Sequence, residues 1–219
     1  MLRDAVVDLL AYRLGQRPNM RNAIIAEMDF IIQTELSQRG HNFLWQRQPF
    51  GVISTLVAGQ TRINPGNVLK VDEDTPLSYI LASGGSQPPT VLTYLDGFIP
   101  DRFGGTDNIG APSAWTWIGL GVIEFNRIAD QDYQICGRVY AGDPSIAGTY
   151  GDANNVETNW LRYGADVVIA AVGRRMALSL AADRLYAMFD NDFQTAWNRI
   201  YVEDIAQREA LADRATTEN

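Results

Sequence analysis

The sequence predicts an α+β fold in which N- and C-terminal helices form a helical bundle and the inserted middle of the chain forms an antiparallel β-sheet or sandwich-like region. Apolar residues recur at helical spacing towards both ends, whereas the middle has short alternating runs separated by Gly, Pro and Asn. The chain has 219 residues, of which 46% are hydrophobic, enough for one large domain or two small ones. We expect a helical domain from residues 1–42 and 156–210, an antiparallel β domain over 43–142, a loop over 143–155 and a flexible C-terminal tail over 211–219.

Two helices are expected before the β region. The first ends near Leu14, because Gly15 and Pro18 supply a stop, and Asn19 is the expected N-cap of the second, which runs to Gly40. The expected apolar face of the first helix is Leu2, Val6, Leu9 and Leu10, and that of the second is Ile24, Ile25, Met28, Ile31, Ile32 and Leu36. Together they predict a helical hairpin.

Short strands separated by turn residues begin near Phe43. Ala58 and Gly59 indicate a hairpin turn between strands over 52–57 and 60–63. Further turns are expected at Pro65–Gly66 and Gly84–Gly85. These signals predict antiparallel strands that continue into an aromatic-rich stretch.

That stretch, residues 110–142, predicts two further strand pairs. Trp115 and Trp117 fall on the same face of one strand, and a turn at Gly119–Gly121 leads into a strand over Val122–Phe125. Tyr133, Ile135 and Val139 are expected to share a face of the next strand. With Tyr140, the two tryptophans could form an exposed platform for sugar rings, but aromatic residues on a half-buried sheet usually fill its core, so we favour the core interpretation.

The chain after the β region predicts an exposed loop over 142–160 and then two helices. The first carries an apolar stripe and many alanines, which allow close helix packing. Asp190 or Asp192 is the expected N-cap of the second. The stripe of the first helix is Ile169, Val172, Met176 and Leu180, and that of the second is Phe193, Trp197, Ile200, Tyr201 and Ile205.

Composition excludes several function classes. The net charge of −8 argues against a sequence-independent grip on nucleic acid, and no apolar run approaches the length of a membrane span, so we expect a soluble protein. Cys136 is the single cysteine, expected as a small strand residue, and His41 is the single histidine, expected to be structural or exposed. The sequence contains no Gly-rich phosphate loop, no G-x-S-x-G elbow, no H-E-x-x-H and no EF-hand loop. We therefore predict no enzyme, no cofactor, no metal and no catalytic residues.

Acidic clusters are the remaining candidates for chemistry. Asp72, Glu73 and Asp74, or Asp190 with Asp192, could hold a hard cation or act as paired carboxylates. We interpret the first cluster as part of a turn and the second as a helix cap. Asp130 and Asp132 are expected at turn positions where carboxylates bond nearby backbone.

The order of elements resembles that of the head-to-tail adaptor proteins of tailed bacteriophages. The segment "RNAIIAEMDFIIQTELSQRGHNFLWQ" is similar to the family's second helix leading to a Trp. The segment "IGAPSAWTWIGLGVIEFNRIADQDYQICGRVYAG" is similar to its Gly-x-Pro, aromatic and strand-turn-strand unit. The segments "NWLRYGADVVIAAVGRRMA" and "NDFQTAWNRIYVEDI" are similar to its closing helices. The likeness covers most of the chain; departures are the turn at Asn126–Ala129, which lacks the family's prolines, and a long "TVLTYLDGFIPDRFGGTDN" stretch.

The resemblance implies a structural virion protein without a catalytic site. It implies a homo-oligomeric ring of twelve copies in the virion neck, between the portal and the tail or nozzle proteins, assembled in the host cytoplasm. DNA would pass non-specifically through its channel, whose acidic wall would repel phosphate. We expect the C-terminal residues to form a strap that becomes ordered on the portal. The strap residues are Leu211, Ala212, Asp213, Arg214, Ala215, Thr216, Thr217, Glu218 and Asn219.

Three alternatives stay open at this point. A tail-tube or tail-terminator ring protein would differ in the neighbour that it touches. A carbohydrate-binding β-module of the tail would be a monomer whose tryptophan fluorescence responds to a glycan. A tail enzyme such as a lysin would lose activity when Glu124 or an Asp pair is replaced by Ala.

Overall fold

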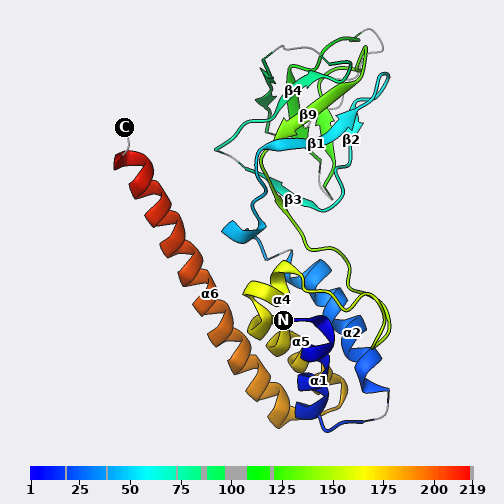
Figure 1. Cartoon of the computed structure of the whole chain (residues 1–219), viewed down its shortest axis with the longest axis vertical. Helices are drawn as coiled ribbons and strands as arrows, with labels where there is room; N and C mark the ends of the chain where they lie inside the picture. Colours follow the sequence, from blue (N-terminus) through cyan, green and yellow to red (C-terminus); the bar gives the residue numbers. More distant parts are fainter. Residues whose placement is uncertain are drawn as a thin grey trace. The chain divides into compact units, whose positions relative to one another are not determined.

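The structure, a computed structural model, describes residues 1–17, 19–37, 39–72, 74–84, 88–96, 108–118 and 121–217 (Figure 1). It contains two compact units, which we call the helical unit, Met1–Trp45 with Asp143–Asn219, and the strand unit, Gln46–Gly142. Helices occupy both ends of the chain and a largely antiparallel β region lies between them in the sequence, so the α+β fold class is confirmed.

The helical unit is built from helices at both ends of the chain. From the N-terminal part come α1 (Arg3–Arg13), α2 (Met20–Phe30), and the π-helical turns η1 (Ile31–Leu36), followed by a short 3₁₀ turn, η2 (Leu44–Gln46), at the unit boundary. From the C-terminal part come α4 (Asn159–Tyr163), α5 (Ala165–Ser179) and α6 (Asp183–Thr217). None of these described helices has both the length and the apolar character that a bilayer crossing requires.

The core of the helical unit follows the predicted stripe of the second helix. All six residues of that stripe are buried, and Val6 and Leu10 of α1 are buried against them. The prediction that Leu2 belongs to the apolar face of the first helix is wrong, because Leu2 lies just before α1 and is half exposed. Asn19 is the N-cap residue of α2, as predicted, but it has a left-handed conformation and its side chain makes no capping hydrogen bond to the helix.

A tight turn joins α5 to α6 earlier than expected. Ala181 has a φ of 52°, and α6 begins at Asp183, so Asp190 and Asp192 lie inside the helix and do not cap it. The two helices approach closely where Gly173 faces Phe189, because a Cβ atom added at Gly173 would lie 2.4 Å from the Phe189 ring. Absence of a side chain at one position of α5 therefore makes room for the buried ring of α6.

The strand unit contains two four-stranded sheets and one two-stranded ribbon. The first sheet has the order β1-β9-β4-β5 and the second has the order β2-β8-β7-β6, while β3 pairs with β10. The strand bounds are β1 Gly51–Leu56, β2 Arg62–Ile63, β3 Val68–Val71, β4 Ser78–Leu81, β5 Thr90–Val91, β6 Thr93–Tyr94, β7 Ala114–Trp117, β8 Ile123–Phe125, β9 Tyr133–Gly137 and β10 Val139–Ala141. Every pair between these strands is antiparallel except β6 with β7.

The expected hairpin between β1 and β2 is wrong. A turn does form, with the Gln60 amide donating to the Val57 carbonyl, but β1 pairs with β9 and β2 pairs with β8. The turn therefore passes the chain from one sheet to the other. By contrast, β7 and β8 pair as predicted, with Trp115 opposite Phe125. Gly119 of the expected turn lies outside the described residues.

Aromatic and branched side chains fill the core of the strand unit. Trp115, Phe125, Tyr133, Ile135 and Val139 are all buried in one cluster, and Trp117 packs against it. This confirms the core interpretation for most of the aromatic-rich stretch. Cys136 is a buried residue of β9, where burial raises the pKa of its thiol and keeps it protonated.

Candidate functional site

The predicted strap residues 211–217 form the last turns of α6, a 35-residue helix, in place of an irregular tail. Figure 1 shows the C-terminal half of α6 continuing beyond the end of α5. Leu211 is 51% exposed, and Ala212, Asp213 and Arg214 are exposed as well. Glu218 and Asn219 lie outside the described residues. Leu211 recurs at helical spacing after Phe193 and Ile200, so it lies on the same face of α6 as these buried residues.

A buried carboxylate fixes α6 at the base of this segment. Asp204 is 3% exposed and accepts hydrogen bonds from the Leu44 amide at 2.6 Å and from Arg208 Nε at 2.7 Å. His41 Nε2 lies 3.0 Å from the same carboxylate, and the Arg208 guanidinium also donates to the Asn42 carbonyl. We call Asp204 and these partners the Asp204 clasp. His41 therefore has a structural position, tied to α6.

Behind the clasp lies an aromatic cluster that sequence reasoning missed. Phe43 packs edge-on against Trp160 and Trp197, with ring centroids 5.5 Å and 5.6 Å apart, and stacks on Trp45 at 5.2 Å. Trp160 and Trp197 occupy apolar positions of helices, which is a detectable signal, but nothing in the sequence pairs them with the segment before the β region. The cluster joins both terminal parts of the chain in one unit.

The long loop after the strand unit is held in place by Arg3. The Arg3 side chain is fully buried and donates to the Ile146 carbonyl at 3.2 Å, the Thr149 carbonyl at 2.9 Å and the Asp152 carboxylate at 2.7 Å. Burial by itself would lower the pKa of Arg3, but hydrogen bonds with Asp4 and Asp152 raise it above its usual value. A charge buried in this way must be paired, so Arg3 is an anchor for the loop.

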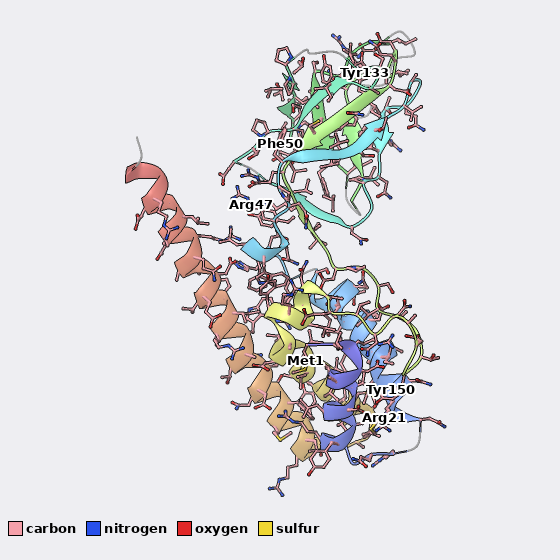
Figure 2. The ribbon with its side chains drawn as sticks, viewed as in Figure 1. Met1, Arg21, Arg47, Phe50, Tyr133 and Tyr150 are labelled. Atoms are coloured by element: carbon pink, nitrogen blue, oxygen red, sulfur yellow. The ribbon has the colours of Figure 1, made fainter. Side chains whose placement is uncertain are left out.

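The same loop is attached to α1 and α2 by further polar contacts. Tyr150 donates from its hydroxyl to Asp8 at 2.7 Å, and the Arg21 guanidinium lies 5.1 Å from the Tyr150 ring centroid. Figure 2 labels Tyr150 and Arg21 in the helical unit. Hydrogen bonds from Tyr150 and then Arg21 lower the pKa of Asp8. Asp29 accepts from the Ile146 amide at 2.7 Å. The loop was predicted to be exposed, and it is nevertheless held by polar partners that range from the buried Arg3 to the exposed Asp8 and Arg21.

One cavity of the strand unit is lined largely by aromatic and apolar side chains. It has a volume of about 380 Å³, and we call it the aromatic cavity. Trp115 is 7% exposed and its indole N–H has no acceptor among the described residues, while the Tyr94 ring lies 4.7 Å from the Trp115 ring. The lining residues are Leu69, Lys70, Val71, Asp72, Pro76, Leu92, Tyr94, Trp115 and Trp117. The structure thus brings Trp115 and Trp117 to one cavity, and Tyr140 is buried and not part of its lining.

The first acidic cluster is part of a turn with an ion pair. Asp72 is 3% exposed and accepts from Arg47 Nε at 2.8 Å, while the Thr75 amide donates to the Asp72 carbonyl. Asp74 lies 3.7 Å from the same guanidinium and is exposed. Glu73 lies outside the described residues. Figure 2 labels Arg47, the basic residue that pairs with Asp72 and Asp74.

The remaining acidic candidates also have structural partners. Asp190 lies 3.1 Å from Arg174, and Asp192 lies 3.9 Å from Arg13. Asp132 accepts from the Ala58 amide, a residue distant in sequence, so its expected bond to nearby backbone is wrong. Among the described residues no group of three His, Cys, Asp or Glu side chains is placed to hold a metal ion.

Glu124, the candidate acid of the enzyme alternative, is a buried residue of β8. Its carboxylate accepts from Arg62 Nε at 2.8 Å, and its second oxygen has no partner among the described residues. Arg62 lies opposite Glu124 in the pairing of β2 with β8. The pair joins two strands of one sheet.

Comparison with known proteins gives no assignment: no protein-family model and no curated protein matches this chain.

Proposed function

We propose that this chain is the subunit of a head-to-tail adaptor ring in a tailed bacteriophage. The proposal starts from the resemblance of four sequence segments to that family, which the α+β fold accommodates. In this proposal the subunit works through its surfaces, and its partners are identical subunits, the portal protein and the tail or nozzle proteins. DNA passes through the centre of the ring.

The observation that best supports this proposal is the exposed end of α6. Helices gain most of their stability in proteins from packing an apolar face, and the residues from Glu209 to Arg214 are exposed. Leu211 lies on the face that α6 buries further towards its N-terminus, so this face presents an exposed apolar side chain that a partner could cover. The Asp204 clasp holds the helix at the base of that segment. A rigid helix that presents its last turns is suited to dock on a second protein.

The charge of the chain is consistent with a channel through which DNA passes. The net charge of −8 is negative, and a surface of this sign repels the phosphate backbone. A ring also requires two different complementary surfaces on each subunit, because each copy contacts its neighbours head to tail. In this proposal the helical unit and the strand unit supply these surfaces.

The test of this function is binding to the portal protein encoded by the same phage. We expect full-length chain to bind assembled portals and a chain ending at residue 210 to fold but fail to bind. A point variant, Leu211→Asp, places a charge on the exposed face and is expected to weaken binding. Leu178→Asp, at a residue in the last turn of α5 that is 68% exposed, is the matched control. If the full-length, truncated and Leu211→Asp chains bind the portal equally well, residues 211–219 do not act as a portal-binding strap.

A further inference from the structure

We propose that Arg39, at the surface of the helical unit, binds a carboxylate of an acidic protein partner. This inference does not depend on the adaptor function, and it concerns a surface other than the C-terminal end of α6. It rests on how the guanidinium is held, on the acceptors that it lacks and on the charges around it.

The Arg39 side chain is held over two aromatic rings of α6. Its guanidinium carbon lies 4.3 Å from the Phe193 ring centroid and 4.9 Å from the Trp197 ring centroid. Both distances are within the roughly 6 Å over which a cation is attracted to an aromatic face. Arg39 is exposed and follows the π-helical turns of η1, so the rings restrict the position of a cation that a partner can reach.

The Arg39 guanidinium has no oxygen acceptor in the described part of the chain. Its side chain makes no hydrogen bond and no ion pair with any described residue, although a guanidinium has five N–H donors. Burial, and then the nearby Arg174, lower the pKa of Arg39, because a partly desolvated cation beside a second cation is destabilised. A carboxylate at this position would accept from the free donors and neutralise the charge.

The charges of the same surface do not supply that carboxylate. Arg174, whose guanidinium lies 4.8 Å from the Phe193 ring centroid, is 3.1 Å from Asp190 and 3.8 Å from Glu35. Glu35 raises the pKa of Arg39 from a longer distance, without forming an ion pair with it. Of the described cations that contact these two rings, Arg39 is therefore the one that lacks an anionic partner.

An Asp or Glu side chain of a protein fits this one free cation. A planar guanidinium matches the two oxygens of a carboxylate, and such paired bonds are among the strong charge-assisted ones. Nucleic acid is a poorer fit, because its affinity comes from many cations that contact phosphates. Asp190 and Glu35, which pair with Arg174, would also repel a doubly charged phosphate more than a singly charged carboxylate. Arginine and tryptophan are, moreover, residues that dominate binding at protein interfaces.

The test is a titration of the full-length chain with a glutamate hexamer, followed by calorimetry and by the NMR resonances of the arginine Nε–H groups, with a serine hexamer as the control peptide. We expect saturable binding of the glutamate peptide only, with a shift of the Arg39 resonance. Arg39→Lys keeps the positive charge but removes the planar guanidinium, so it should weaken binding by about tenfold or more, which corresponds to one charge-assisted hydrogen bond. Arg184→Lys, at an exposed arginine of α6 that contacts no described ring, should leave the affinity unchanged.

Inorganic phosphate and thermal unfolding separate this inference from its alternatives. Phosphate should leave the Arg39 resonance unshifted at concentrations at which the glutamate peptide saturates it. Arg39→Lys removes no hydrogen bond within the described chain, so it should unfold close to the temperature of the unaltered chain while it weakens peptide binding. The inference is overturned if the glutamate peptide does not bind, if Arg39→Lys binds it as tightly as the unaltered chain, or if phosphate shifts the Arg39 resonance as strongly as the peptide does.

Discussion

The Arg3 guanidinium lies 2.7 Å from the Asp152 carboxylate, although 149 positions separate the two residues in the sequence. The contact ties the start of the chain to the loop that follows the strand unit. Both residues belong to the helical unit, so this unit is closed by an ion pair between its two sequence segments. Because the Arg3 side chain is fully buried, this ion pair contributes to the stability of the helical unit.

Replacing Arg3 is therefore expected to destabilise the helical unit. Arg3→Met leaves the carboxylates of Asp4 and Asp152 without their cation, and breaking a buried ion pair should lower the free energy of unfolding by about 3 kcal/mol. Denaturant unfolding measures this loss. Arg162→Met removes an exposed pair with Glu157 and should change the free energy of unfolding much less. Similar losses in both variants would contradict the anchoring role.

The carboxylate partner gives this anchor a pH dependence. The Thr149 amide, and then the Arg3 guanidinium, lower the pKa of Asp152 in the folded chain. The ionised form is thus favoured by folding, so its stabilisation is present at neutral pH and is lost as the pH falls below about 4 towards the lowered pKa. Asp152→Asn should unfold at a lower temperature than the unaltered chain at pH 7. That difference should shrink near pH 3, and a constant difference would contradict the assignment.

Gly173 provides a test of the packing between α5 and α6. Alanine favours helices over glycine by about 1 kcal/mol, yet a Cβ atom here would lie 2.4 Å from the ring of Phe189, which is fully buried. Overpacking of this kind costs about 1–3 kcal/mol, so Gly173→Ala should be destabilising on balance. Phe189→Leu should relieve the clash, and the double variant should lose less stability than the sum of the two single losses in a mutant cycle. Strict additivity would show that the two positions do not collide.

The Asp204 clasp predicts local order in the C-terminal half of α6. Asp204→Asn weakens the bonds from Leu44 and Arg208, and its cost should be about 2 kcal/mol because these bonds involve a buried charge. Amide hydrogen exchange in the turns after Asp204 should become faster, and trypsin should cleave sooner after Arg208. Glu209→Gln alters an exposed residue of the same helix and is the control. Unchanged exchange in Asp204→Asn would mean that the clasp does not order this segment.

The best predictions from the sequence concern elements that are determined by residues close together in the chain. The stripe from Ile24 to Leu36 repeats at helical spacing, and its residues are buried. Trp115 alternates with Trp117 on one strand, and β7 pairs with β8 across a short turn. In these cases the residues that interact are close in the sequence, so the spacing of apolar residues is enough to predict the element and its buried face.

The sequence could not predict features that depend on distant partners. Nothing in the local sequence marks Arg3 as a buried residue, because its burial requires the loop around Asp152. Ala181 forms a turn with a positive φ, although alanine favours helix, because α6 must fold back along α5. The strands on either side of Ala58–Gly59 belong to different sheets, and turn residues do not specify which strand pairs with which. For the candidate site, the terminal segment is a hypothesis from the sequence, whereas its helical form and the clasp at its base were not predicted.

The proposed adaptor role is tested most directly by imaging virus particles that contain this chain and by locating the chain in them. We expect a closed ring of identical subunits between the portal and the tail, with the C-terminal end of α6 in contact with the portal. A density for this chain away from the neck, or a single copy in place of a ring, would contradict it.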